Sequence, residues 1–291
     1  MPTFDTPSPI AVTVEIGVGD IQISATDRPD TVVDIRPSDP AKESDVVAAE
    51  KVRVEYANGR LLIRAAKMWK RYTPTGGRES IDVRIDLPAG SDFHGEAGIA
   101  GLRCSGPLGE CHYKAGLGDI HVKQASTTTL KVGSSDVFVD RVGGRAEVTT
   151  GSGTISVGRV EGDAVIKNSN GDTWIGDVTG GLRVNAANGK IAVDRATAGV
   201  VAKTANGDIC VDELAAGTVV LHTGFGQIDL GIRHGVAAWL DLVTSFGKVR
   251  NELSAGDAPG PEEHTVEVRA RTAFGNITVR RPSRHEGTGA A

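Results

Sequence analysis

Residues 67 to 72 combine positive charge with aromatic rings in a way that suits binding: Lys67, Trp69, Lys70, Arg71 and Tyr72. Trp, Tyr and Arg are the residue types that most often dominate the binding energy of protein interfaces. The structural alternative is that the tryptophan packs on neighbouring strands while the cations lay their alkyl stems over apolar surface. We expect a loop here, with a protein partner favoured over a nucleic acid.

In contrast to this candidate binding segment, the sequence contains no recognised motif for catalysis or for metal binding. The sequence has no G-x-S-x-G, no H-E-x-x-H and no phosphate-binding loop. Cys111 and His112 adjoin, and Cys104 precedes them by seven residues. This is not a zinc-binding spacing, and one histidine with two cysteines leaves a set of four ligands incomplete. Alternation points both cysteines inward, so we expect buried thiols, with no catalytic residue, cofactor or metal.

Acidic side chains recur directly after glycines, at Asp119, Asp136, Asp172 and Asp208. Stacked carboxylates could bind Ca²⁺, which takes six to eight oxygen ligands. Other residue types interrupt this file, however, and aspartate is favoured at tight corners for its own hydrogen bonding. We therefore interpret the file as turn chemistry. The interrupting residues are Thr154, Lys190, Gln227 and Lys248.

A basic file lies four residues before the same glycines. It could bind an anionic polymer, but the chain carries a net charge of −5, which makes it a poor ligand for polyanions. We interpret the file as a solvated sheet face and expect no nucleic-acid partner. The file comprises Lys114, Lys131, Lys167, Lys203 and Arg271.

These side chains lie on an internal repeat, and the repeat predicts the secondary structure that positions them. Its corner positions are evenly spaced from Gly118 to Gly226, and the interval then lengthens before Gly247 and again before Gly275. Apolar residues alternate on both sides of each corner glycine, which is the period-2 signature of strands with one buried face. Each repeat is thus predicted to form one turn of an all-β, single-stranded β-helix of about ten turns, stacked about 4.8 Å apart.

Stacking in this way brings equivalent corner residues above one another. Asn170, Asn188 and Asn206 each precede an aligned glycine, and their amides can hydrogen-bond along the stack. Phenylalanines take over the same position later in the chain, which predicts a stack of rings. We interpret both as one structural ladder, whose aromatic members are Phe225, Phe246 and Phe274.

The two ends of the chain depart from the period. Residues 1–90 are predicted to form a strand-rich cap, with a hairpin turning at Asn58–Gly59 and a short helix within residues 39–51. Residues 91–281 form the β-helix domain, and 282–291 a disordered tail. The broken period near the C-terminus suggests a second cap, and residues 254–264 an inserted acidic loop rich in Pro and Gly.

The N-terminal sequence, the hydrophobic runs and the cysteine count together predict where the protein is located in the cell. The N-terminus lacks the basic and apolar regions of a signal peptide, and no apolar run is long enough to span a membrane. Three scattered cysteines do not form a disulfide framework. We therefore expect a soluble cytoplasmic protein without membrane insertion.

The stretch SIDVRIDLPAGSDF, followed by tandem GxGDIxV-like units, resembles a bacterial β-strand-repeat family of unknown function that is commonly labelled "putative adhesin". The resemblance covers about residues 80–281, and its motif of glycine and alternating Ile/Val is structural. It implies the fold, with right-handedness taken by analogy, and it supplies no catalytic residues.

Two classes of function remain. The first is a non-catalytic scaffold or adhesin-like binding protein, with a protein partner or self-association. The alternative is a polysaccharide-binding or polysaccharide-active β-helix protein. An outward Trp174, with Phe138 two turns away, could form a shallow face for stacking carbohydrate, although such residues more often cover apolar surface. Short loops and the lack of paired carboxylates weigh against the enzyme.

Overall fold

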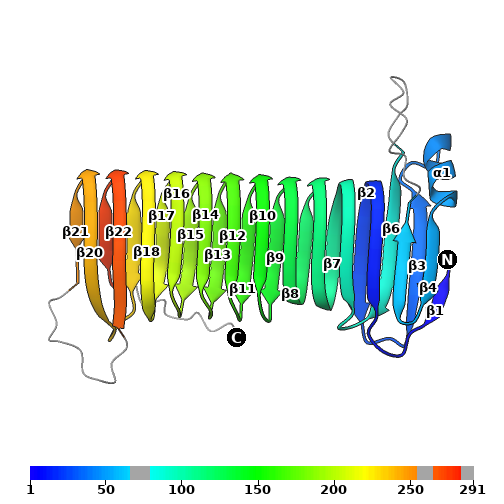
Figure 1. The fold of residues 1–291 in the computed structure, drawn as a ribbon, viewed down its shortest axis with the longest axis horizontal. Coiled ribbons are helices and arrows are strands. Elements are labelled where there is room, and N and C mark those ends of the chain that lie inside the picture. Colours follow the sequence, from blue (N-terminus) through cyan, green and yellow to red (C-terminus); the bar gives the residue numbers. More distant parts are fainter. Residues whose placement is uncertain (66–78, 254–264, 283–291) are drawn as a thin grey trace, which may run out of the picture.

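Each repeat forms one coil of a β-solenoid in the computed structural model, which describes residues 1–65, 79–253 and 265–282. One strand precedes the corner glycine and a second follows it. Equivalent strands pair in parallel and in register, so Ile155 lies beside Val137 on one side and Thr173 on the other. The coils stack into the rod shown in Figure 1. The predicted all-β solenoid is confirmed, and its handedness stays a prediction.

The strands make two faces that enclose the core. Face A is formed by the strands before the corner glycines and face B by the strands after them; β2, β7 and β8 turn corners and contribute to both. Face A comprises, in order along the rod, β4 (Arg53–Ala57), β5 (Arg60–Arg64), β2 (Ala11–Thr26), β7 (Asp92–Leu117), β8 (Ile120–Ser134), β10 (Ala146–Ser152), β12 (Ala164–Asn170), β14 (Leu182–Asn188), β16 (Val200–Asn206), β18 (Gly217–Phe225), β22 (Thr265–Phe274) and β20 (Ala237–Phe246). Face B comprises β1 (Thr3–Asp5), β3 (Asp30–Pro37), β6 (Ile81–Pro88), the later parts of β2 and β7, the start of β8, β9 (Val137–Val142), β11 (Ile155–Val160), β13 (Thr173–Val178), β15 (Ile191–Ala196), β17 (Ile209–Leu214), β19 (Ile228–Ile232), β23 (Ile277–Arg280) and β21 (Val249–Asn251).

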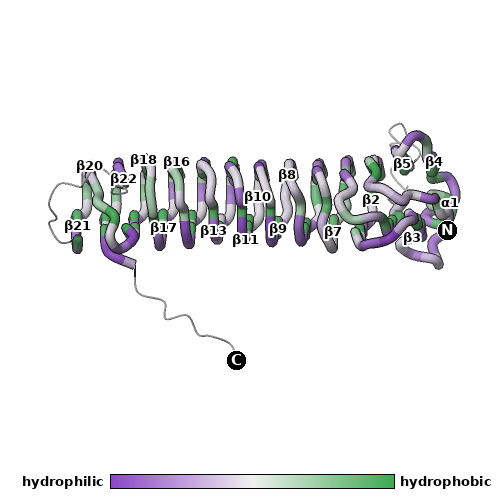
Figure 2. Tube along the Cα trace, turned by 90° about the horizontal axis from the view of Figure 1, so that it is seen from below, coloured by the Kyte–Doolittle hydropathy of each residue, from purple (hydrophilic) through white to green (hydrophobic). Residues whose placement is uncertain are grey.

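Small aliphatic side chains fill the core between the faces. Ile120, Leu130 and Val157 are fully buried, as are their equivalents in most coils. Burying one such side chain contributes about 1.5–3 kcal/mol, and the alternation delivers several per coil. Figure 2 shows the same pattern as alternating hydrophobic and hydrophilic segments along the rod.

The corner glycines explain the recurring Asn-Gly pairs. At Gly189 φ is +128°, and an added Cβ would lie 2.1 Å from the carbonyl oxygen of Gly171 in the preceding coil. Both the left-handed backbone and the close stacking therefore require a residue without a side chain.

Chain order and spatial order differ at the N-terminal end. β2 lies between β7 on one side and the coil formed by β5 and β6 on the other, although all three of these strands follow β2 in the sequence. β3 then adds antiparallel to β6, and β1 to β3. The predicted hairpin joins β4 to β5 through Asn58 and Gly59, both at positive φ. The short helix α1 (Glu43–Glu50) lies in the predicted segment, at the same end of the rod (Figure 1).

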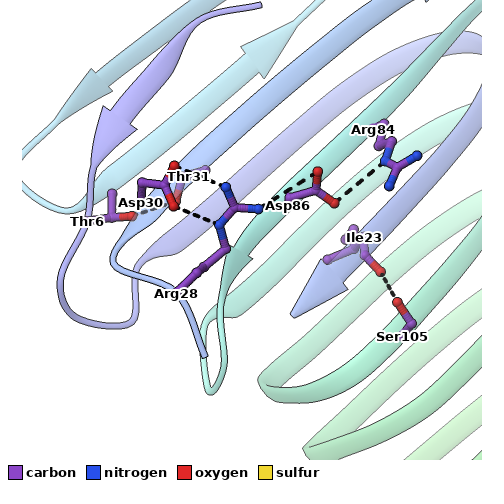
Figure 3. A network of polar contacts seen from close by, with 8 residues as sticks. All are labelled: Thr6, Ile23, Arg28, Asp30, Thr31, Arg84, Asp86 and Ser105. Atoms are coloured by element: carbon purple, nitrogen blue, oxygen red, sulfur yellow. Dashed lines mark hydrogen bonds and ion pairs between the residues drawn. The ribbon is translucent and has the colours of Figure 1, made fainter. Parts of the chain in front are cut away.

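A polar network ties this end together (Figure 3). Arg28, between β2 and β3, donates two hydrogen bonds to Asp30 at 2.9 and 3.0 Å and lies 3.8 Å from Asp86 of β6. The Arg28 guanidinium lowers the pKa of the Asp30 carboxyl below its usual range. The hydroxyls of Thr6 and Thr31 share a buried hydrogen bond of 2.8 Å. These contacts join the N-terminal antiparallel strands to the first coils of the rod.

The C-terminal end corrects an expectation drawn from the sequence. The last repeats do not stack in chain order, because β22 pairs with both β18 and β20, and β23 with both β19 and β21. Figure 1 shows the red β22 between the yellow β18 and the orange β20. Within the described residues, β20 and β21 form a terminal coil that is paired on one side only. The broken period therefore marks a place where spatial order departs from chain order, and the expected C-terminal cap stays a prediction.

In the described parts of the chain, no helix is long and apolar enough to cross a membrane. The division at residue 90 into a cap and a repeat domain stays a prediction, and the described strands form one continuous sheet. The predicted inserted loop and disordered tail fall outside the described residues, apart from Pro282.

Candidate functional site

The predicted partner-binding loop, with Lys67, Trp69, Lys70, Arg71 and Tyr72, lies outside the described residues. The described chain ends at Ala65, whose N–H donates to the carbonyl of Glu15 at 2.9 Å, and resumes at Glu79 before β6. The strands on either side of this segment, β5 and β6, both pair with β2. The role of the loop stays a prediction.

The asparagines of the ladder lie on the surface at the corner between the faces. Asn188 donates from Nδ2 to Oδ1 of Asn170 at 2.9 Å, and Asn206 donates in the same way to Asn188 at 2.9 Å. Asn206 lies in register with Phe225 of the next coil. The amides thus bond neighbouring coils and offer no inward-facing site.

Aromatic rings continue this file to the end of the rod. Phe225, Phe274 and Phe246 stack in that spatial order with 4.8 Å between neighbouring ring centroids. Their exposed fractions are 56%, 46% and 68%, so stacking leaves much of each ring in solvent. This exposed apolar strip leads directly to the terminal coil.

The corner aspartates act within the fold. Oδ1 of Asp172 accepts a hydrogen bond of 2.8 Å from the backbone N–H of Lys190 in the next coil, and Oδ1 of Asp208 accepts one of 2.7 Å from Gln227. Asp136 makes the same kind of bond at 2.6 Å. These carboxylates satisfy amides at coil junctions, as turn chemistry predicts.

The basic file does not form a continuous strip on face A. Thr149 separates Lys131 from Lys167, and Asn185 separates Lys167 from Lys203. A polyanion that tracks the rod would meet a cation only at alternate coils along this stretch.

A row of rings lies on face B at the middle of the rod. His121 stacks on Phe138 with 4.8 Å between ring centroids. Ser156 follows in register and then Trp174, whose Nε1 donates to Oδ1 of Asp194 at 2.9 Å. Phe138 and Trp174 are 36% and 39% exposed. The two exposed rings are thus separated along face B by the small side chain of Ser156.

The thiols are poorly placed for chemistry. Cys104 and Cys111 are 3% and 0% exposed, and burial raises the pKa of the Cys104 thiol well above its ordinary value. Cys210, on face B, is partly exposed, and burial followed by the nearby Asp212 raises its pKa to about 11. All three are free cysteines. The raised pKa values keep the thiols of Cys104 and Cys210 protonated near neutral pH.

The sequence of residues 10–213 matches the Toastrack DUF4097 family. The chain belongs to this family. The match begins just before β2 and ends within β17, so it contains the Asn ladder and the row of rings on face B. No curated protein matches the chain.

Several solved structures resemble this Toastrack protein. One is described as a "putative cell adhesion protein" from Clostridium sporogenes, with 13% identity, coverage of 95% of this chain and 94% of that one, and a TM-score of 0.25. A "putative adhesin" from Parabacteroides distasonis shares 12% identity, with coverage of 95% of both chains and a TM-score of 0.28. A "putative lipid binding protein" from the same organism shares 11% identity, with coverage of 97% and 96% and a TM-score of 0.33. None of these descriptions, nor that of the family, names an enzyme, and TM-scores below 0.5 carry nothing about the ligand of this chain.

The terminal coil of the Toastrack protein lies beyond the family match. Trp239, Val243 and Phe246 of β20 are 58%, 48% and 68% exposed, and Val249 of β21 is 46% exposed. Leu242 points inward yet is only partly buried, because no strand of the described chain covers its outer side. This coil thus carries four of the exposed large hydrophobic side chains of the described residues.

One cluster was missed by the sequence reasoning. His94, Glu110 and His112 each offer a ligand atom, and these atoms all lie within 4.8 Å of one another on face A. The signal was present, since His94 precedes His112 by one full period of the repeat. The coil that carries His94, however, lacks the glycine motif on which the repeats align.

Proposed function

We propose that this Toastrack protein is a non-catalytic scaffold that associates with a second copy of itself through its terminal coil. The observation that carries the proposal is the bare outer edge of β20 and β21, which pair only with β22 and β23 among the described strands. Unpaired N–H and C=O groups along such an edge form a template for another strand.

Among the described residues, the long edge strand β20 lacks the usual protection against pairing. Soluble proteins blunt their edge strands with lysine, proline, bulges or a covering element. β20 reads AAWLDLVTSF, with Asp241 as its single charge and no proline. The opposite end of the rod differs, because its edge strands are short: β1 has three residues, and β4 has five, of which Arg53 and Glu55 are charged. One long apolar edge at one end and two short edges at the other favour a closed dimer over a filament.

Two parts of the same chain are alternative occupants of the edge. Residues 254–264, which follow β21, contain Pro259 and Pro261 and offer, besides these prolines, no apolar residue larger than alanine. Residues 283–291 are similarly poor in apolar side chains. Proline lacks the N–H that a paired strand needs, which disfavours residues 254–264, and the lack of large apolar side chains leaves both segments little surface to bury. Neither segment therefore suits the edge as well as a second copy does.

Charge also suits an end-to-end contact between copies. The terminal coil carries Asp241 and Glu252 against Lys248 and Arg250, so its formal charge is zero. Two such ends do not repel one another. A twofold axis across the rod places β20 of one copy antiparallel to β20 of the other and covers Leu242 and Val243 together.

Light scattering of the purified protein over a range of concentrations tests the proposal. We expect a mass of twice 30.3 kDa at high concentration. Val243→Lys places a charge on the edge and shifts the equilibrium to monomer. His222→Lys is the matched control, because His222 holds the same repeat position in β18 and is separated from Val243 by Arg271 of β22. A wild-type protein that stays monomeric, or a Val243→Lys variant that stays dimeric, contradicts the proposal.

A second candidate function is carbohydrate binding on face B. Phe138 and Trp174 are two coils apart, which places them on the order of 10 Å from each other. Sugar rings stack on exposed aromatic faces, and Asp194 next to Trp174 offers a hydrogen-bond acceptor. Binding to a glycan panel that Trp174→Ala abolishes and Trp239→Ala preserves would support this function. Equal binding by both variants would place any glycan site elsewhere.

A further inference from the structure

Two histidines and a glutamate converge on face A near the N-terminal end of the rod. β7 passes along this face twice, at residues 92–99 and 110–117, and the two passes are adjacent coils. The rings of His94 and His112 are parallel within 3°, with 4.7 Å between their centroids. Glu110 lies two residues before His112 on the same strand and side, with Oε2 at 3.6 Å from Nε2 of His112.

This donor set is typical of a transition-metal site. Imidazole nitrogens suit Zn²⁺, Cu²⁺ and Ni²⁺, whereas Ca²⁺ and Mg²⁺ prefer oxygen ligands alone. Two histidines and one carboxylate also form the ligand set of zinc sites that keep an open position. The three ligand atoms lie within 4.8 Å of one another. Contraction to the roughly 3.4 Å between ligands on a tetrahedral zinc needs only side-chain rotation, because the backbones are already one strand spacing apart.

The surroundings leave these ligands available. His94 and Glu110 are exposed and His112 is partly exposed. The nearby carboxylates of Glu15 and Glu96 are paired with Arg64 at 2.8 Å and with Lys114 at 3.1 Å. A shallow depression of about 320 Å³ is lined by His94, His112 and Thr13, so the open positions of a bound ion face solvent. Two cations, Lys114 and Lys131, line the same depression, and Lys114 is paired with Glu96.

We propose that His94, Glu110 and His112 bind one divalent transition-metal ion of the zinc class. Nitrogens of two adjacent coils and one carboxylate oxygen hold the ion, and water completes its coordination. The ion bridges two coils and stabilises the N-terminal half of the rod by binding the folded state. Because imidazoles and carboxylates bind metal only when deprotonated, affinity falls as the solution is acidified.

Isothermal titration of ZnCl₂ into tag-free, chelator-treated full-length protein tests the site. We expect one zinc ion per chain, with affinity reduced at least about tenfold in His94→Ala, in His112→Ala and in Glu110→Gln. His121→Ala is the matched control: it removes an outward histidine that also stacks on a ring of the adjacent coil, but on a phenylalanine. This variant should bind zinc as the wild type does.

A second readout separates the site from non-specific surface binding. Co²⁺ bound by nitrogen and oxygen ligands in a four-coordinate site gains visible absorption that hydrated Co²⁺ lacks, and both histidine variants should lose it. Circular dichroism verifies that the exposed substitutions leave the fold intact. If the His94→Ala/His112→Ala double variant binds zinc with wild-type affinity, or if the wild type binds none, the proposal is wrong.

Discussion

Phe225 stacks on Phe274, with the ring planes parallel and 4.8 Å between centroids, although Phe246 is the next phenylalanine of the file in sequence. Phe246 lies on the far side of Phe274. β20 and β21 therefore lie at the end of the rod, one position beyond the place that chain order predicts for them. β22 and β23 occupy the position between them and β18 and β19. The N-terminal strand β2 is likewise enclosed, between β7 and the coil of β5 and β6. Both ends of the rod therefore share one feature. A strand near a chain terminus, β2 or β22, lies between two strands that are further from that terminus in the sequence.

Engineered disulfides test this order. Phe225→Cys/Phe274→Cys places two cysteines on adjacent parallel strands, within the Cα separation that a disulfide spans. We expect this pair to oxidise in the folded protein. Phe225→Cys/Phe246→Cys places them two strands apart, about 9.6 Å, which is too far to bridge. Non-reducing electrophoresis after mild oxidation distinguishes the two pairs. A crosslink that forms only in the second pair would show that the last coils stack in chain order.

Sequence periodicity predicts most of the rod, because residues one period apart must stack once the coils form. The bonds between Asn170, Asn188 and Asn206 follow from their even spacing along the chain. The inward positions follow from alternation alone. The same rule places His94 beside His112, but only when the period is extended into a coil that lacks the corner glycine motif.

The order of the last coils cannot be read in the same way. β20 and β22 carry the same inward pattern, with Leu240 and Leu242 opposite Val268 and Ala270. Either strand would bury its apolar face against β18, so the pattern does not distinguish the two arrangements. The longer intervals before Gly247 and Gly275 show that the period breaks, and the preference between orders comes from connections and packing that periodicity does not encode.

Two leucines at one repeat position test how bare the terminal coil is. Leu221 in β18 is 1% exposed, whereas Leu242 in β20 is only partly buried. In monomeric protein, Leu221→Ala should cost about 2–5 kcal/mol and lower Tm by roughly 5–10 °C. Leu242→Ala should cost clearly less, because less packing is lost. Calorimetry at low concentration measures both, and equal losses would mean that the terminal coil is covered in solution.

The asparagine ladder should contribute measurably to stability. Asn188→Ala removes two amide hydrogen bonds, to Asn170 and from Asn206, and should cost about 1–2 kcal/mol. Ser152→Ala is the control at the same corner position, one coil before Asn170. Thermal unfolding followed by circular dichroism compares them. A loss of stability in the serine variant as large as that in Asn188→Ala would show that the corner position, and not the amide bonds, is responsible.

Cys210 gives a prediction about pH. Burial first, then the Asp212 carboxylate, raises the pKa of this thiol to about 11; Sγ donates a hydrogen bond of 3.5 Å to Oδ1 of Asp212, which favours the protonated form. The reactive thiolate forms only as pH rises toward that value, so at pH 8 its population is on the order of a hundredfold below that of an ordinary cysteine.

Asp212→Asn removes the negative charge and should speed iodoacetamide labelling of Cys210 at pH 8 several-fold. Cys210→Ser should abolish the labelling, because Cys104 and Cys111 are buried. Asp212 also pairs with Arg280 at 3.2 Å, so the variant's Tm must be checked alongside. If wild type and folded Asp212→Asn label at the same rate, the carboxylate does not control this thiol.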